Sequence, residues 1–155
     1  ENFILLANDL IVQLFESNWE ARHGALKGLL ALLKAWEMES SENSPVPNIL
    51  YLQRWSEDIS CACMCLLILD RFSDFGNCFN IVAPVREMAA QTLGCSATNL
   101  TDSALENCAE NLKDILMHKK SEGEVNAMDD WEARQGSLLA IFYMADNIKK
   151  KASKN

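Results

Sequence analysis

Hydrophobic residues recur every three or four positions along most of this chain, a pattern that predicts amphipathic α-helices. The stretch from Ser17 to Trp36 shows it most clearly. A Ser followed three residues later by Glu20 predicts a capping box at the start of this helix. The expected buried stripe consists of Leu26, Leu29, Leu30, Leu33 and Trp36. The expected polar face consists of Glu20, Lys27 and Lys34.

Part of this stretch recurs near the other end of the sequence. The pattern Trp-Glu-Ala-Arg-x-Gly-x-Leu begins at Trp19 and again at Trp131, each time with an N-cap residue two positions before the Trp. We therefore predict an internal repeat. The residues that we assign to the structural repeat are Trp19, Glu20, Arg22 and Gly24 in the first copy and Trp131, Glu132, Arg134 and Gly136 in the second.

Small residues interrupt the first repeated helix at Gly24, Ala25 and Gly28. Glycine costs about 1 kcal/mol relative to alanine inside a helix, so its presence there needs a reason. We expect these positions to let a neighbouring helix approach closely.

Helical periodicity extends over most of the remaining chain. Residues 3–16 are apolar on nearly every side, which predicts a helix covered on more than one face, and the polar stretch 39–47 with two prolines predicts a linker. Pro84 fits only the first turn of a helix, so that helix should start near Ile81. Further helices are expected at about 48–71, from Thr101 to about 119, and at about 130–150, with turns at 73–80 and 121–128.

These elements predict an all-α fold. No segment alternates with period two for long enough to indicate a strand. Six helices in three antiparallel pairs, at about 3–38, 48–97 and 101–150, are typical of an α-solenoid of HEAT-like repeats. We expect residues 1–155 to form a single unit of this kind.

Composition and charge narrow the possible partners. The 155 residues are 49% hydrophobic and 23% charged, which suits one domain with a sizeable core. No apolar run reaches the roughly 18 residues of a membrane span. The absence of an initiator Met and of a leader suggests a piece of a longer chain. A net charge of −8 favours basic protein partners and argues against direct contact with nucleic acid. The cluster Lys149–Lys151 is better explained as the C-terminal end of a helix, where positive charge is favourable, than as a nucleic-acid contact.

Six cysteines raise the questions of disulfides, metal and thiol chemistry. Cys61, Cys63 and Cys65 are too close together on one helix to pair with each other, and they lie in an uncharged run that predicts reduced, buried thiols. Their spacing does not match a zinc site. We expect neither a metal nor a cofactor.

Catalytic motifs are missing as well. The sequence has no phosphate-binding loop, no zinc-protease helix and no nucleophile elbow. His23, beside small residues on a helix, is expected to act in packing or hydrogen bonding. A thiol enzyme using Cys61 to Cys65 would need an exposed thiol of low pKa. We expect a protein without an active site.

Aromatic, basic and turn residues remain as candidates for structure and binding. Trp19 and Trp131 should pack between helices. Arg22 and Arg134 should point toward a neighbouring repeat and form a ladder with acids at turns or helix ends, such as Asp70 or Asp74. Turns along one edge of a solenoid form a continuous surface. The candidate partner-facing residues are therefore Glu16, Ser17, Asn18, Asp74, Asn77, Asn80, Asp129 and Asp130.

Several of these strings resemble one known family. They are Trp-Glu-x-Arg-His-Gly-Ala-x-x-Gly-Leu from Trp19, Leu-Asp-Arg-Phe-x-Asp-Phe from Leu69, Val-Ala-Pro-Val-Arg-Glu from Val82, and Trp-Glu-x-Arg-x-Gly from Trp131. In order and spacing they are similar to the N-terminal HEAT repeats of the TATA-binding-protein-associated Swi2/Snf2 ATPase, a Mot-type transcription regulator. The segments 39–48 and 95–128 match poorly.

The resemblance implies a function that the residues alone do not show. Members of this family hold TATA-binding protein with their HEAT array and strip it from promoter DNA with a C-terminal ATPase motor. For this chain the resemblance implies a non-catalytic scaffold segment in the nucleus, with TATA-binding protein and adjacent HEAT repeats of the same chain as partners. The alternative is a HEAT-type protein-binding adaptor of another pathway.

Overall fold

The helices pack in consecutive pairs along the chain. The computed structural model describes residues 2–39, 49–70, 84–117 and 131–153, and these contain no strand. The helices are α1 (Asn2–Gln13), α2 (Trp19–Glu39), α3 (Ile49–Leu69), α4 (Pro84–Ser96), α5 (Asp102–Met117) and α6 (Trp131–Ala152), with a short 3₁₀ turn, η1 (Ala97–Asn99), after α4.

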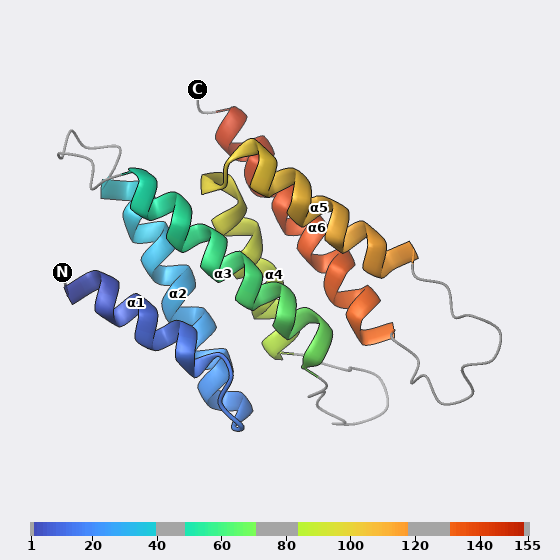
Figure 1. Ribbon diagram of the computed structural model, residues 1–155, viewed down its shortest axis with the longest axis horizontal. Helices are drawn as coiled ribbons and strands as arrows, with labels where there is room; N and C mark the ends of the chain where they lie inside the picture. The colour runs from blue at the N-terminus through green and yellow to red at the C-terminus, as the bar shows by residue number, and fades with distance from the viewer. Residues whose placement is uncertain (1, 40–48, 71–83, 118–130, 154–155) are drawn as a thin grey trace.

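Three helix pairs, α1/α2, α3/α4 and α5/α6, lie side by side and run antiparallel within each pair (Figure 1). Helix α4 also packs against α2 and α6, so it lies at the centre of the molecule. The fold is all-helical, as the periodicity predicts. None of the described helices is long and apolar enough to cross a membrane.

Helix starts are set by short polar side chains. The backbone N–H of Glu20 donates to Asn18 Oδ1 at 2.9 Å, and the N–H of Arg22 donates to the Asn18 carbonyl oxygen at 3.3 Å. Asn18 is therefore the N-cap of α2, and the predicted capping box between Ser17 and Glu20 is wrong by one residue. At the start of α5 the N–H of Ala104 donates to Thr101 Oγ1 at 3.3 Å, so Thr101 is the N-cap and the predicted start of this helix is confirmed.

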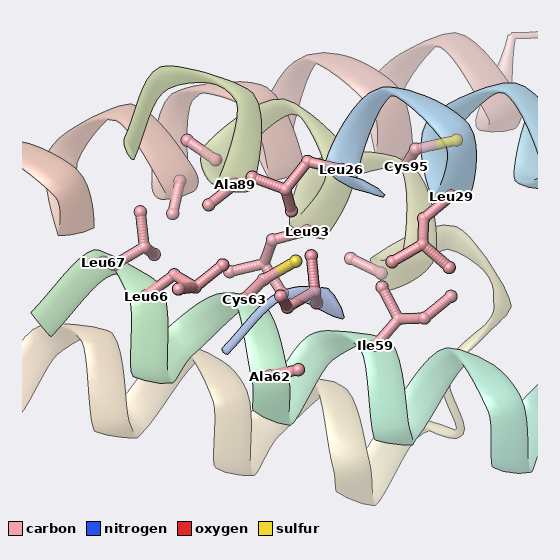
Figure 2. Close-up of a cluster of buried hydrophobic side chains, with 14 of the residues drawn as sticks. Leu26, Leu29, Ile59, Ala62, Cys63, Leu66, Leu67, Ala89, Leu93 and Cys95 are labelled. Carbon is pink, nitrogen blue, oxygen red and sulfur yellow. The ribbon is translucent and has the colours of Figure 1, made fainter. Parts of the chain in front are cut away.

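The hydrophobic core lies where α2, α3 and α4 meet (Figure 2). The predicted α2 stripe is confirmed, because Leu26, Leu29 and Leu33 are fully buried and Leu30 and Trp36 are half-buried. The buried residues that face it are Ile59, Cys63 and Leu66 from α3 and Val85, Ala89 and Leu93 from α4.

Helix α1 is covered less than its sequence predicts. Leu5 and Val12 are 62% and 69% exposed, so the expectation of cover on more than one face is wrong. The helix packs mainly against α2, where the Leu10 side chain lies over Gly28. Nearly uniform apolarity did not distinguish the face that packs from the face that remains exposed.

The small residues of the repeated helices have different roles. A methyl group added to Gly28 would lie 2.9 Å from Leu10 Cδ1, and one added to Gly136 would lie 3.2 Å from the Leu67 carbonyl oxygen. Both glycines permit close helix approach, as predicted for Gly28. Gly24 is exposed, and no described atom lies within 4 Å of such a methyl group, so the prediction is wrong there.

Candidate functional site at the starts of the repeated helices

Arg22 connects three parts of the chain. Its Nε donates to Asp70 Oδ2 at 2.8 Å, and its Nη1 donates to the carbonyl oxygens of Glu16 and Ser17 at 2.8 and 2.9 Å. It therefore joins the turn after α1 to the residue that follows α3. The predicted pairing of Arg22 with the helix-end acid Asp70 is confirmed.

Burial makes this pair stronger than an ordinary surface ion pair. The side chains of Arg22 and Asp70 are 15% and 1% exposed. An exposed pair contributes about 0–1 kcal/mol, whereas removal of one partner from a buried pair costs about 3–5 kcal/mol because the other charge loses its compensation. The Arg22–Asp70 pair is close to the buried case.

Arg86 extends the network across α4 to α6. It is fully buried, its Nη1 donates to the Asp70 carbonyl oxygen at 3.2 Å, and its Nη2 donates to Gln135 Oε1 at 3.0 Å. Its guanidinium carbon also lies 5.6 Å from the centre of the Trp131 ring, within the range of a cation–π contact. The C-terminal end of α3 and the starts of α2, α4 and α6 thus lie along one side of the molecule (Figure 1).

Sequence analysis did not assign Arg86 to this network, although a signal for it exists. Arg22, Arg86 and Arg134 are each followed three residues later by a small buried residue: Ala25, Ala89 and Ser137. This spacing places the three arginines near the starts of α2, α4 and α6, but it does not predict their surroundings, because Arg86 is buried and Arg134 is exposed.

The two repeated tryptophans differ in their surroundings. Trp19 is partly buried and packs against the core, as predicted, with its ring edge-on to His23 at a centroid distance of 6.2 Å. Trp131 is 41% exposed, so the expectation of packing between helices holds only for its contact with Arg86. The other repeat positions lie mostly outward, with Glu20 and Arg134 exposed and Glu132 half-buried.

His23 acts in packing. Its Nδ1 is buried without a hydrogen-bond partner among the described atoms, and burial, with a smaller contribution from Lys27, lowers the pKa of the imidazole below 6.5. The side chain is therefore neutral at pH 7. Nothing in this arrangement resembles a general base held by a second polar group.

The thiols are divided between the core and the surface. The five described cysteines are free; Cys63, Cys95 and Cys108 are buried, but Cys61 and Cys65 are exposed, which corrects the expectation of buried thiols. A helix turns by about 100° per residue, so an uncharged run need not be buried on every side. Burial raises the pKa of Cys95 and Cys108 to about 11, and it also raises the pKa of Cys61 and Cys63. These shifts oppose the thiolate that a thiol enzyme needs.

The candidate partner-facing turns are described only in part. Glu16, Ser17 and Asn18 are exposed next to the Arg22 network. The remaining candidates, Asp74, Asn77, Asn80, Asp129 and Asp130, lie outside the described residues. Within the described ranges, no group of three or more His, Cys, Asp or Glu side chains is placed to hold a metal ion.

The network is therefore a structural device that fixes helix starts along one edge of an all-helical protein. Similar sequences occur in TATA-binding-protein-associated factors. The chain is 35% identical over 141 residues to human TATA-binding protein-associated factor 172, 38% over 141 residues to Saccharomyces cerevisiae MOT1, and 32% over 145 residues to Aspergillus fumigatus mot1.

These alignments cover 89%, 86% and 92% of the chain but only 7%, 7% and 8% of the respective relatives. The chain is homologous to one segment of these Mot1-type factors, which confirms the family resemblance. No family model and no solved structure matches the chain.

Proposed function

We propose that this chain is a non-catalytic HEAT-repeat scaffold segment of a nuclear transcription regulator. The regulator would bind TATA-binding protein and remove it from promoter DNA with an ATPase motor located elsewhere in the full-length protein. The observation that carries this proposal is homology over 86–92% of the chain to proteins named as TATA-binding-protein-associated factors. The segment would need no cofactor of its own.

The register of the internal repeat supports the HEAT-like arrangement, with pairs at about 3–38, 48–97 and 101–150 and a connecting segment at 39–47. Trp19 and Trp131 are 112 positions apart, so the α2 stripe Leu26, Leu29 and Leu30 corresponds to Leu138, Ile141 and Phe142 of α6. Leu26 and Leu29 are fully buried in the cluster that includes Ala89 and Leu93 of α4 (Figure 2).

Their counterparts on α6 are open to solvent. Leu138, Ile141 and Phe142 are 59%, 38% and 64% exposed. Since α4 covers this stripe on α2, an equivalent helix would cover it on α6 in the full-length protein. The exposed stripe thus supports adjacent HEAT repeats of the same chain as partners of this segment.

The turn after α1 offers a described part of the partner-facing edge. Arg22 holds the carbonyl groups of Glu16 and Ser17, so the turn is fixed while its side chains stay exposed. A chain of net charge −8 is complementary to a basic partner, and such charge pairs act mainly on association rate and specificity.

Calorimetry with purified TATA-binding protein at two salt concentrations tests the proposal. We expect salt-sensitive binding that Glu16→Lys weakens by about threefold or more, because an interface charge is reversed. Glu110→Lys, the same change at an exposed site in α5, is the matched control. Failure of the folded chain to bind, or equal loss with both variants, would contradict a partner-facing role for this turn.

A further inference from the structure

A second possible contact site lies away from the Arg22 network. A pocket of about 180 Å³ opens between α1, the end of α2 and the first half of α3. Its lining is mainly apolar and includes Ala7 of α1, Trp36 of α2, and Tyr51, Leu52 and Trp55 of α3. We propose that this pocket takes one aromatic or large aliphatic side chain carried by a basic segment of a partner protein.

The size and lining of the pocket fit one ring. An apolar cavity of about 150 Å³ in another protein binds benzene, so the present volume suffices for an aromatic side chain. Tyr51 is 58% exposed, whereas Ala7 on the opposing helix is buried. A side chain entering here would therefore cover apolar surface that is now exposed to solvent.

The residue types are those that dominate protein–protein contacts. Tryptophan, tyrosine and arginine are enriched among the few residues that carry most of the binding free energy of an interface. Two tryptophans, one tyrosine and Arg54 line this single pocket. Such a concentration on two neighbouring helices favours an anchor pocket for a partner over a site for a polar metabolite.

The charges around the pocket indicate which charge the partner's residues beside the anchor side chain should carry. In the pocket wall the charges of Asp58 and Arg54 balance each other. The helices around the pocket add Asp9 of α1, Glu57 of α3 and, near the end of α2, Lys34 and Glu37, so acidic residues outnumber basic ones. The bound segment should therefore carry lysine or arginine beside its anchor.

Three short peptides separate the contributions of anchor and charge. We would titrate the folded chain with acetyl-Lys-Phe-Lys-amide, acetyl-Lys-Ala-Lys-amide and acetyl-Glu-Phe-Glu-amide. The readout is the four tryptophan indole N–H signals in a ¹⁵N–¹H spectrum, assigned by single Trp→Phe variants. We expect the Lys-Phe-Lys peptide to move the signals of Trp36 and Trp55, while those of Trp19 and Trp131 stay in place.

Neighbouring exposed residues provide a matched pair of variants. Tyr51→Ala should weaken binding of the Lys-Phe-Lys peptide by about fivefold or more, because it removes an aromatic wall of the pocket. Leu50→Ala, at a 67% exposed residue outside the pocket, should change it by less than about twofold. Asp58→Asn should reduce the preference for the basic over the acidic peptide.

The proposal is overturned if the Lys-Ala-Lys peptide binds as tightly as the Lys-Phe-Lys peptide, since charge alone would then explain binding. It is equally overturned if the acidic peptide binds as well as the basic one, or if Tyr51→Ala and Leu50→Ala have the same effect. None of these outcomes depends on whether TATA-binding protein contacts the turn at Glu16.

Discussion

Arg22 satisfies two backbone carbonyl groups and one buried carboxylate, and its loss should therefore be costly. We expect Arg22→Ala to lower the free energy of unfolding by about 3 kcal/mol, because the buried carboxylate of Asp70 would lose its ion pair with Arg22. Urea denaturation followed by circular dichroism measures the change.

Lys34→Ala is the control for this variant, because Lys34 is exposed on the same helix. Its effect should stay within about 0.5 kcal/mol. A double-mutant cycle with Asp70→Ala should show that the two losses are not additive. Additive losses, or equal effects of Arg22→Ala and Lys34→Ala, would mean that the pair does not stabilise the fold.

His23 should make stability depend on pH in a defined direction. Its pKa is lowered in the folded protein, chiefly by burial, so folding favours the neutral imidazole. The stability associated with the neutral form is fully present above the unfolded pKa of 6.5 and is lost as the pH falls through the folded pKa. Gln135 occupies the equivalent position in the second repeat, so His23→Gln is a mild replacement.

Unfolding free energies of both proteins at about pH 7.5 and about pH 5 measure this effect. The wild type should lose more stability on acidification than His23→Gln, since the carboxyl groups are common to both. An identical decrease in the two proteins would show that His23 does not contribute to the pH dependence.

Among the helices, the contact between α4 and α6 depends most on a small residue. A methyl group at Gly94 would lie 2.6 Å from Tyr143 Cβ and 2.7 Å from the Tyr143 backbone carbon, and backbone cannot move aside as a flexible side chain can. We expect Gly94→Ala to lower the free energy of unfolding by about 1–3 kcal/mol despite the better helix propensity of alanine.

Gly24→Ala is the matched control, because no described atom lies within 4 Å of the added methyl group. It should stabilise the protein by up to about 1 kcal/mol through helix propensity. Thermal unfolding of both variants measures the contrast. A neutral or stabilising Gly94→Ala would contradict the close approach of α4 and α6.

Sequence periodicity predicted the helices and the buried stripe of α2, because a helix that buries one face must place hydrophobic residues at every third or fourth position. It did not predict the N-cap, since Ser17 and Asn18 are both good capping residues and only backbone geometry selects Asn18. It also could not distinguish Gly24 from Gly136, which share one sequence pattern but have different neighbours in space. The Arg22–Asp70 pair was predictable from a helix-start arginine and a helix-end acid. The hydrogen bonds of Arg86 to the Asp70 carbonyl oxygen and to Gln135 were found only in the structure.

At the scale of the whole molecule, the Arg22 network and the core have complementary roles. The core holds α2, α3 and α4 together and reaches α6 through Ala140 and Met144. Arg86 adds a polar connection to α6 through Gln135 and Trp131. The surfaces that remain are the turn at Glu16, the pocket at Tyr51 and the apolar stripe of α6. They lie on different parts of the molecule, so each can be altered without changing the others.

The α6 stripe should make the isolated chain self-associate. Leu138, Ile141 and Phe142 expose neighbouring apolar side chains, and contiguous exposed apolar surface favours association. We expect the apparent mass from light scattering to rise with concentration, and the double variant Leu138→Gln with Phe142→Gln to remain monomeric. The double variant should keep the wild-type helix content, because Leu138 and Phe142 do not belong to the core.

Leu5→Gln with Val12→Gln is the control, because these residues are similarly exposed on α1 but lie outside the repeated string that begins at Trp19. This variant should associate like the wild type if the α6 stripe is the docking face for a further helix. Association that disappears with the α1 variant and persists with the α6 variant would place the self-associating surface on α1 and remove the support that the stripe gives to a further repeat.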